Sequence, residues 1–123
     1  MDQRFFYYTQ LPSLAVPNNL FDVRFISTAN ITVAFNTLKA GAEVPEHEHI
    51  HETIDYIQEG ELEMSIGNET IRMYAGMVAR VPSNIAHSAR AVTNCKVINI
   101  FYPCGKILKR CKKVPVFYRI HFL

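Results

Sequence analysis

The sequence predicts an all-β sandwich or barrel, and three observations support this. From about Val23 onward, short segments that alternate apolar and polar residues, or are rich in β-branched and aromatic residues, follow one another with Gly or Pro between them. No stretch of ten or more residues in this region has the 3.6-residue period of a helix. The 123 residues, 49 % of them hydrophobic and 20 % charged, suit one globular domain with its own core.

Most of the expected strands end at a turn signal. Residues 61–66 alternate strictly and stop at Gly67, and the next segment alternates again and stops near Gly76. Residues 53–58 are rich in β-branched and aromatic residues and end before Gly60. The complete set of predicted strands is 22–27, 31–36 with a continuation to 40, 53–58, 61–66, 69–74, 77–82 and 95–102.

Composition divides the chain into three parts. Residues 1–22 are expected to form an N-terminal lead-in with at most one short helical turn, residues 23–103 the barrel, and residues 104–123 a tail. The tail holds six of the 13 basic residues and none of the 11 acidic ones. A solvated surface segment is the favoured interpretation of this charge, ahead of contact with nucleic acid or a membrane. The apolar end of the tail, 114–123, needs cover from the domain or from a second subunit.

The chain has no run of 18 apolar residues and no signal-peptide pattern at its start. We therefore expect no membrane span and a cytoplasmic location. The three cysteines, Cys95, Cys104 and Cys111, are odd in number and match no zinc-binding spacing. In the cytoplasm they are expected to be free thiols.

Three of the five histidines, His47, His49 and His51, stand two residues apart. Side chains on a strand alternate between faces, so all three can project to the same side of one strand. Neutral imidazole is the commonest protein ligand for a transition metal, and the row therefore predicts a metal site. His87, farther along the chain, is a fourth candidate.

The spacing around these histidines resembles the two motifs of the cupin family. The first is the pattern Gly-x5-His-x-His-x3-Thr-x6-Gly over residues 41–60. The second is Gly-x5-Pro-x-Asn-x2-His over residues 76–87, with Asn84 at a position where Gly is common. The resemblance covers roughly residues 23–103. It implies a single-domain jelly-roll barrel, the cupin double-stranded β-helix.

Within the cupins the chain resembles the KdgF-type proteins of pectin and alginate degradation, most clearly in the run V-P-S-N-I-A-H-S-A-R-A at 81–91. This resemblance implies opening of the ring of a 4,5-unsaturated uronate to the linear keto form. It also implies a metal held by His47, His49 and His87 together with a Gln or Glu at the position of Thr53. Small cupins commonly pair through strand exchange, so a homodimer is implied as well.

The chain departs from the KdgF-type pattern at two places. Thr53 stands where the pattern has its Gln or Glu ligand, and threonine is a poor metal ligand. The pattern also has an Asp on the last strand, a Phe two residues later and an Arg four residues after that. This chain has Asn99, Phe101 and Gly105 there. The resemblance thus implies that Asn99 and Phe101 are candidate catalytic residues on the last strand. Asn99, however, can only hydrogen-bond a substrate hydroxyl and cannot take a proton.

Other side chains are candidates to complete the site. His51 either supplies a fourth nitrogen in place of Thr53 or is a partly exposed residue in the turn before the next strand. Asp55 shares the strand face of Thr53. It is expected either to act as an acid or base or to orient a histidine, or else to pair with an arginine at the barrel mouth. Arg80 and Arg90 are candidates for binding an anionic substrate, with surface ion pairing as the favoured alternative.

The leading hypothesis from the sequence is a metal-dependent cupin that acts on an anionic small molecule of the sugar-acid type. Three neutral nitrogens suit Zn, Ni, Fe or Mn and leave coordination positions for water or substrate. Two alternatives stay open. One is a non-catalytic cupin that binds a small carboxylate or acts as a sensor, and the other is an iron-dependent oxygenase.

Overall fold

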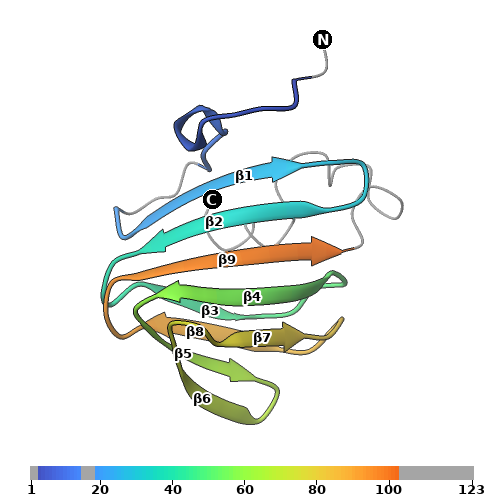
Figure 1. Ribbon diagram of the computed structural model, residues 1–123. Coiled ribbons are helices and arrows are strands. Elements are labelled where there is room, and N and C mark those ends of the chain that lie inside the picture. The colour runs from blue at the N-terminus through green and yellow to red at the C-terminus, as the bar shows by residue number, and fades with distance from the viewer. Residues whose placement is uncertain (1–2, 15–18, 103–123) are drawn as a thin grey trace.

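The computed structural model describes residues 3–14 and 19–102, which form a barrel of two facing β-sheets (Figure 1). One 3₁₀ turn, η1 (Tyr8–Gln10), precedes the strands. The strands are β1 (Phe21–Ser27), β2 (Thr32–Leu38), β3 (Glu43–His47), β4 (Glu52–Glu59), β5 (Glu61–Ile66), β6 (Glu69–Tyr74), β7 (Val78–Val81), β8 (His87–Ala91) and β9 (Cys95–Tyr102). The described residues contain no α-helix, so the predicted all-β class is confirmed. None of their helical turns is long and apolar enough to cross a membrane.

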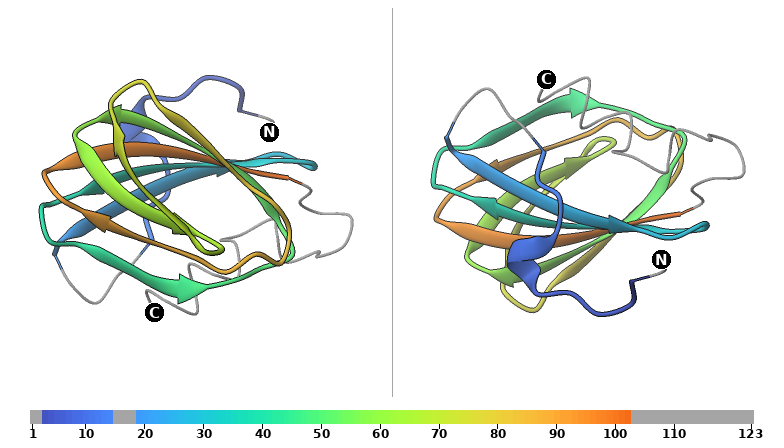
Figure 2. Two further views of the ribbon diagram at one scale, coloured as in Figure 1. Left: turned by 90° about the horizontal axis from the view of Figure 1, so that it is seen from below. Right: turned by 90° about the horizontal axis from the view of Figure 1, so that it is seen from above.

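Neighbouring strands run antiparallel in both sheets, and the two sheets curve around a common interior (Figure 2). The larger sheet has the strand order β1-β2-β9-β4-β7, and the smaller one has the order β3-β8-β5-β6. The last strand, β9, lies between β2 and β4. Segments that are far apart in the sequence therefore meet on one inner surface.

The predicted strand segments correspond to seven of the nine strands, and the other two, β3 and β8, were not predicted. β3 reads E-V-P-E-H and β8 reads H-S-A-R-A, so neither has the run of β-branched residues that marks a strand. β3 is the edge strand of its sheet, which is where a proline is tolerated. β1 begins two residues before the expected start of the barrel, and η1 lies within the expected lead-in. The predicted tail, 104–123, is outside the described residues.

Two apolar clusters fill the space between the sheets. The larger includes Ile57 and Val81, neither of which has any exposed surface. The smaller includes Val23 and Phe101, which are each 1 % exposed. Full burial of such side chains contributes about 1.5–3 kcal/mol each to stability. Members of both clusters, such as Leu62 and Phe101, also line the cavity described below.

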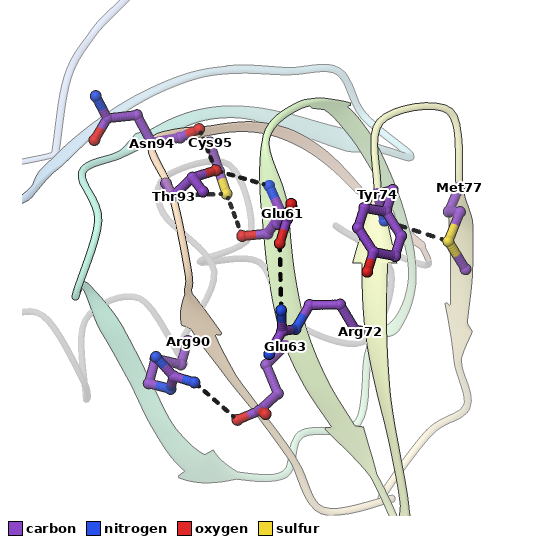
Figure 3. Close-up of polar contacts among 9 residues, drawn as sticks. All are labelled: Glu61, Glu63, Arg72, Tyr74, Met77, Arg90, Thr93, Asn94 and Cys95. Atoms are coloured by element: carbon purple, nitrogen blue, oxygen red, sulfur yellow. Dashed lines mark hydrogen bonds and ion pairs between the residues drawn. The ribbon is translucent and has the colours of Figure 1, made fainter.

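Cys95 begins β9 and is a free, buried thiol, as predicted. Its Sγ donates hydrogen bonds to the carbonyl oxygens of Glu61 and Thr93, at 3.0 and 3.2 Å (Figure 3). These bonds fasten the start of β9 to β5. The predictions for Cys104 and Cys111 concern residues that are not described.

The outer faces of the two sheets differ in polarity. On the four-stranded sheet, Arg90 lies 3.5 Å from Glu63 and Arg72 lies 3.3 Å from Glu61 (Figure 3). The outward positions of the five-stranded sheet are instead largely apolar. Its exposed residues include Ile54, Tyr56, Val78, Ile100 and Tyr102. A contiguous exposed apolar face of this kind is typical of an interaction surface.

Gly60, in the turn between β4 and β5, is a position where we expect no side chain to be tolerated. Its φ is +88°, and a Cβ there would overlap the Asn94 carbonyl oxygen and lie 3.0 Å from the Cα of Cys95. Gly76 has a similar φ, +96°, but nothing lies within 4 Å of a Cβ at that position. We expect Gly76→Ala to cost about 1–2 kcal/mol from backbone conformation alone. Gly60→Ala should cost about 1–3 kcal/mol more because its methyl group is also crowded. Chemical denaturation of both variants measures the difference, and equal losses would contradict the close approach at Gly60.

Candidate functional site

Three histidines form a cluster inside the barrel. One ring nitrogen from each of His47, His49 and His87 lies within 4.8 Å of those of the other two. The ring centres of His47 and His87 are 4.2 Å apart, and those of His49 and His87 are 4.8 Å apart. Imidazole nitrogens at these separations could hold one metal ion. The structure thus brings together the three histidines that the two motifs supply.

Two strands and one loop position these rings. His47 ends β3 and is the register partner of His87, the first residue of β8. His49 follows in the loop after β3, where its carbonyl oxygen accepts a hydrogen bond of 2.8 Å from the Asn84 N–H. Asn84 has a φ of +60°, in the left-handed region that Asn adopts more readily than most residues with a side chain. Asn at this position therefore keeps the turn that Gly commonly makes and fastens the His49 loop beside β8.

Hydrogen bonds to the backbone fix the tautomer of all three rings. The Nδ1 atoms of His47, His49 and His87 lie 2.7, 2.9 and 2.8 Å from the carbonyl oxygens of residues 45, 51 and 85, respectively. A carbonyl oxygen can only accept, so each Nδ1 carries the proton and each Nε2 has its lone pair available. Metal-binding histidines are commonly held this way by a second hydrogen bond. The donor set therefore fits a divalent transition metal.

His49 also favours the neutral form that a metal needs. Burial, together with the neighbouring His87 and His47, lowers the pKa of His49 to about 3. A second imidazolium cannot form easily beside the first in a space with little water. His49 is therefore an uncharged nitrogen donor across the physiological pH range.

The expectation that His47, His49 and His51 share one strand face is wrong. β3 ends at His47 and β4 begins at Glu52, so His49 and His51 lie in the connecting loop and not on a strand. His51 is 2 % exposed, which also excludes the partly exposed alternative. The structure places it outside the three-histidine cluster, with its ring 5.9 Å from that of His49. Its backbone carbonyl oxygen accepts a hydrogen bond from His49 Nδ1–H, so the residue supports the cluster through its backbone.

The histidines line a cavity between the two sheets. The volume open to the centres of water molecules is about 70 Å³. One water needs only about 10–15 Å³ by this measure, so several waters or a small organic molecule fit. The walls are mainly apolar and include Phe21, Leu38, Val44, Leu62 and Met64. No Lys or Arg is among the described residues that line it.

A row of three polar side chains forms the wall contributed by β2, β9 and β4. Asn99 Nδ2 donates a hydrogen bond of 2.7 Å to Asp55 Oδ1. Asn36 Nδ2 donates to Asn99 Oδ1 and, at 3.1 Å, to the Val97 carbonyl oxygen. Asp55 and Asn99 are register partners on adjacent strands, which explains their contact. All three polar residues line the same cavity as the histidines.

Sequence comparison identifies the family. The cupin domain family matches residues 34–101, which is more than half of the chain. The chain belongs to the cupin family. The predicted jelly-roll class is thereby confirmed, and so is the resemblance on which the motif assignment was based.

Solved structures show the same fold. An RmlC-like cupin from Shewanella frigidimarina superposes with a TM-score of 0.76 at 20 % identity, covering 86 % of this cupin and 96 % of that chain. KdgF from Halomonas sp. gives a TM-score of 0.75 at 21 % identity, covering 86 % and 98 %. Oxalate decarboxylase from Bacillus subtilis gives 0.72 at 18 % identity, covering 85 % and 30 %. No curated protein matches the sequence.

Asp55 is the one buried carboxylate among the described residues of this cupin, with 7 % of its surface exposed. Burial raises its pKa to about 7, and the hydrogen bond from Asn99 offsets part of the rise. The expected arginine partner is not beside it. Arg90 pairs with Glu63 on the outer face, and Arg80 is exposed on β7, where the inward positions are Ala79 and Val81. Asp55 therefore sits in the cupin cavity as a carboxyl group that can hold or release a proton near neutral pH.

The remaining predicted residues, Thr53 and Phe101, line the same cavity but are poorer metal ligands or proton carriers than the histidines and Asp55. Thr53 is buried on β4, two residues before Asp55, and lines the cavity wall. Phe101 is buried on β9, with its ring 6.2 Å from that of His49 and 6.3 Å from that of His51. It has no group that can transfer a proton, so it acts as an apolar support.

Sequence reasoning missed Asn36. The inward residues of β2 are 32, 34, 36 and 38, so an amide at 36 faces the interior of the barrel. The strict alternation of this strand was the available signal. A polar residue on the apolar face of a strand marks either a satisfied structural group or part of a site.

Ionisation of Asp55 should make the stability of the metal-free protein depend on pH. With a folded pKa of about 7 and an unfolded value of 3.8, its contribution is fully present below about pH 3.8 and is lost as pH rises to about 7. His49 has the opposite sign, because its lowered pKa makes stability rise with pH between about 3 and 6.5. We therefore expect Asp55→Asn to gain stability relative to the unchanged protein as pH rises from 4 to 7, by up to about 4 kcal/mol.

Denaturation curves in the presence of a chelator measure this difference. Thr53→Val is the matched control, since it changes a buried residue of the same strand and cavity without removing a titrating group. Its pH profile should run parallel to that of the unchanged protein. A constant offset between Asp55→Asn and the unchanged protein over this range would contradict the raised pKa of Asp55.

Proposed function

We propose that this cupin binds a divalent transition metal at His47, His49 and His87 and acts on a small molecule of the sugar-acid type. The specific reaction proposed is ring opening of a 4,5-unsaturated uronate. The observation that carries the proposal is the pairing, across one cavity, of three clustered imidazoles with a buried carboxyl group. The similarity in fold to KdgF from Halomonas sp. supports the choice of reaction.

The donor set suits several metals. Nitrogen donors accept Zn, Ni, Fe and Mn, and the similar oxalate decarboxylase of B. subtilis has Mn(II) centres. Three protein ligands leave coordination positions for water or substrate. When bound, the metal would supply a Lewis acid that polarises a substrate oxygen.

The chain's own proton donor and acceptor in this proposal is Asp55. The KdgF-type pattern has a carboxylate at the position of Asn99, and Asp55 is the register partner of that residue on β4. In this chain the two facing positions hold an amide on β9 and a carboxyl group on β4. A group with a pKa of about 7 can act as an acid in one step and as a base in the next.

The apolar walls and the lack of Lys or Arg among the described lining residues narrow the choice of substrate. In the proposed complex the substrate carboxylate lies toward the metal, because no cationic side chain of the described lining could hold it. Asn99 and Asp55 then hydrogen-bond the substrate hydroxyls. We thus propose a small, singly charged substrate and not a polyanionic one.

Metal binding should raise thermal stability only when the three histidines are present. At a metal concentration 100 times the Kd, a site that exists only in the folded protein adds about 2.7 kcal/mol. We expect added Zn²⁺, Ni²⁺ or Mn²⁺ to raise the Tm of the unchanged protein, and His47→Ala, His49→Ala or His87→Ala to abolish the shift.

His51→Ala is the matched control for the metal experiment. It removes a buried imidazole from the same loop but leaves the backbone carbonyl that holds His49. Its starting Tm should fall, while the metal-induced shift and the metal content after dialysis should be retained. Loss of the shift in His51→Ala, or its persistence in His49→Ala, would overturn this assignment of ligands.

Turnover of a 4,5-unsaturated uronate by metal-loaded protein tests the reaction. We expect activity to be lost in His49→Ala and to fall by about 10²–10⁴-fold in Asp55→Asn, the range for removal of a general acid or base. Arg72→Ala, on the outer face of the four-stranded sheet, should have full activity. Absorbance of the conjugated double bond follows the reaction.

If metal-loaded protein shows no turnover above background, the proposed enzymatic function is wrong. Thr53 and Asn99 then favour the second candidate function, a non-catalytic cupin that binds a small carboxylate. Thr53→Gln with Asn99→Asp should confer activity if the scaffold is that of a former enzyme. Oxygen consumption with Fe(II) would instead support the oxygenase alternative.

Homodimer formation and a cytoplasmic location stay predictions from the sequence. The exposed apolar residues of the five-stranded sheet, among them Ile54, Val78 and Ile100, support the first, because a face of this kind is typical of an interaction surface.

A further inference from the structure

Asn36 is a buried polar residue that belongs to neither histidine motif. It lies on β2, is 8 % exposed, and lines the cavity opposite the histidine cluster. Its Nδ2 donates to the Val97 carbonyl oxygen at 3.1 Å and to the Asn99 side-chain oxygen. Asn99 in turn donates to Asp55 at 2.7 Å. The three side chains form a chain of hydrogen bonds across β2, β9 and β4.

The direction of every bond in this chain follows from its first acceptor. The Val97 carbonyl oxygen can only accept, so the Asn36 group that faces it must be the NH₂. The same NH₂ faces Asn99, which must therefore present its oxygen to β2. The Asn99 NH₂ is then turned toward β4 and Asp55. A backbone carbonyl thus sets the orientation of two side-chain amides.

From this geometry we infer that Asn36 is a positioning residue that acts through Asn99. It fixes the Asn99 amide so that the NH₂, and not the oxygen, meets Asp55 Oδ1. Oδ1 is thereby kept as an acceptor, and the proton of the neutral acid is assigned to Oδ2. The catalytic meaning of this positioning rests on the proposed function, because Asp55 is its proton carrier. The hydrogen bonds themselves do not depend on it.

Among the neighbours of Asp55, Asn99 is the main polar group that can alter its ionisation. Its register partners on the two flanking strands are Ala79 and Asn99. Among the described residues that line the cavity, the other titratable groups are His47, His49 and His87. No described Lys, Arg or Glu faces it there. A change at Asn36 that alters Asp55 should therefore pass through the amide of Asn99.

Carbon-13 NMR of the aspartate carboxyls in metal-free protein tests this inference. The chain has three aspartates, Asp2, Asp22 and Asp55, so Asp55→Asn assigns the Asp55 signal directly. Asn36→Leu removes both donors and lets Asn99 rotate. We expect the pKa of Asp55 to rise by about 0.5–1 unit as the hydrogen bond to its carboxylate is partly lost. Asn36→Val, which also lacks an NH₂ and adds no charge, is the second variant and should shift the pKa upward as well.

A double-mutant cycle separates positioning from a purely structural role. Asn99→Leu should raise the pKa of Asp55 by itself, and Asn36→Leu should then add no further shift, because its intermediary is gone. Additive shifts, or an unchanged pKa in folded Asn36→Leu and Asn36→Val, would overturn the inference.

Kinetics provide the separate test of catalytic meaning. If the protein turns over a 4,5-unsaturated uronate, Asn36→Leu should lower kcat about tenfold or more with little change in KM. The apparent pKa that the pH profile of kcat assigns to Asp55 should shift in the same direction as the pKa of Asp55 measured by NMR. If the NMR shifts appear without any turnover, the positioning stands and the proposed function fails. Turnover that Asn36→Leu leaves unchanged would show that Asn36 has no catalytic consequence.

Discussion

The hydrogen bonding of β9 between β2 and β4 is the constraint on which the rest of the structure depends. In this position β9 places Asn99 beside Asp55 and beside the Asn36 donor at the same time. It also places Phe101 against the rings of His49 and His51. A shift of one residue in this register would turn Asn99 and Phe101 to the outer face. Both the core and the polar wall of the cavity therefore depend on the hydrogen-bonded pairing of β9 with β2 and β4.

Burial in the cavity favours the neutral forms of His49 and Asp55. Burial lowers the pKa of His49 and raises that of Asp55, so each group is displaced toward its neutral form. Apolar walls strengthen both effects because little water can enter to solvate a charge. A divalent ion at the histidines would reverse the balance and favour the Asp55 carboxylate. Metal binding and release of a proton from Asp55 should therefore be coupled in this protein.

The sequence contained enough to predict the all-β class, most strands and the three histidines of the cluster, because alternation and motif spacing are local properties. It failed where position depends on distant segments. β3 and β8 have weak strand patterns and are held by pairing to each other and, for β8, to β5. His51 shares the two-residue spacing of His47 and His49, but the end of β3 separates them. Asn36 became meaningful only when β9 placed Asn99 next to it.

The amide at position 99 and the carboxyl group at position 55 give Thr53 a different meaning. In the KdgF-type pattern a Gln or Glu on β4 completes the metal ligands while the acid lies on the last strand. Here the inward positions of β4 include Thr53 and Asp55, so the carboxyl group lies one inward step farther along the strand. Thr53 then lines the cavity two residues before Asp55, and Asp55 is the one buried carboxyl group among the described residues of the cavity. In the proposed reaction the proton passes through Asp55, and Asn36 on β2 orients the Asn99 amide that donates to Asp55.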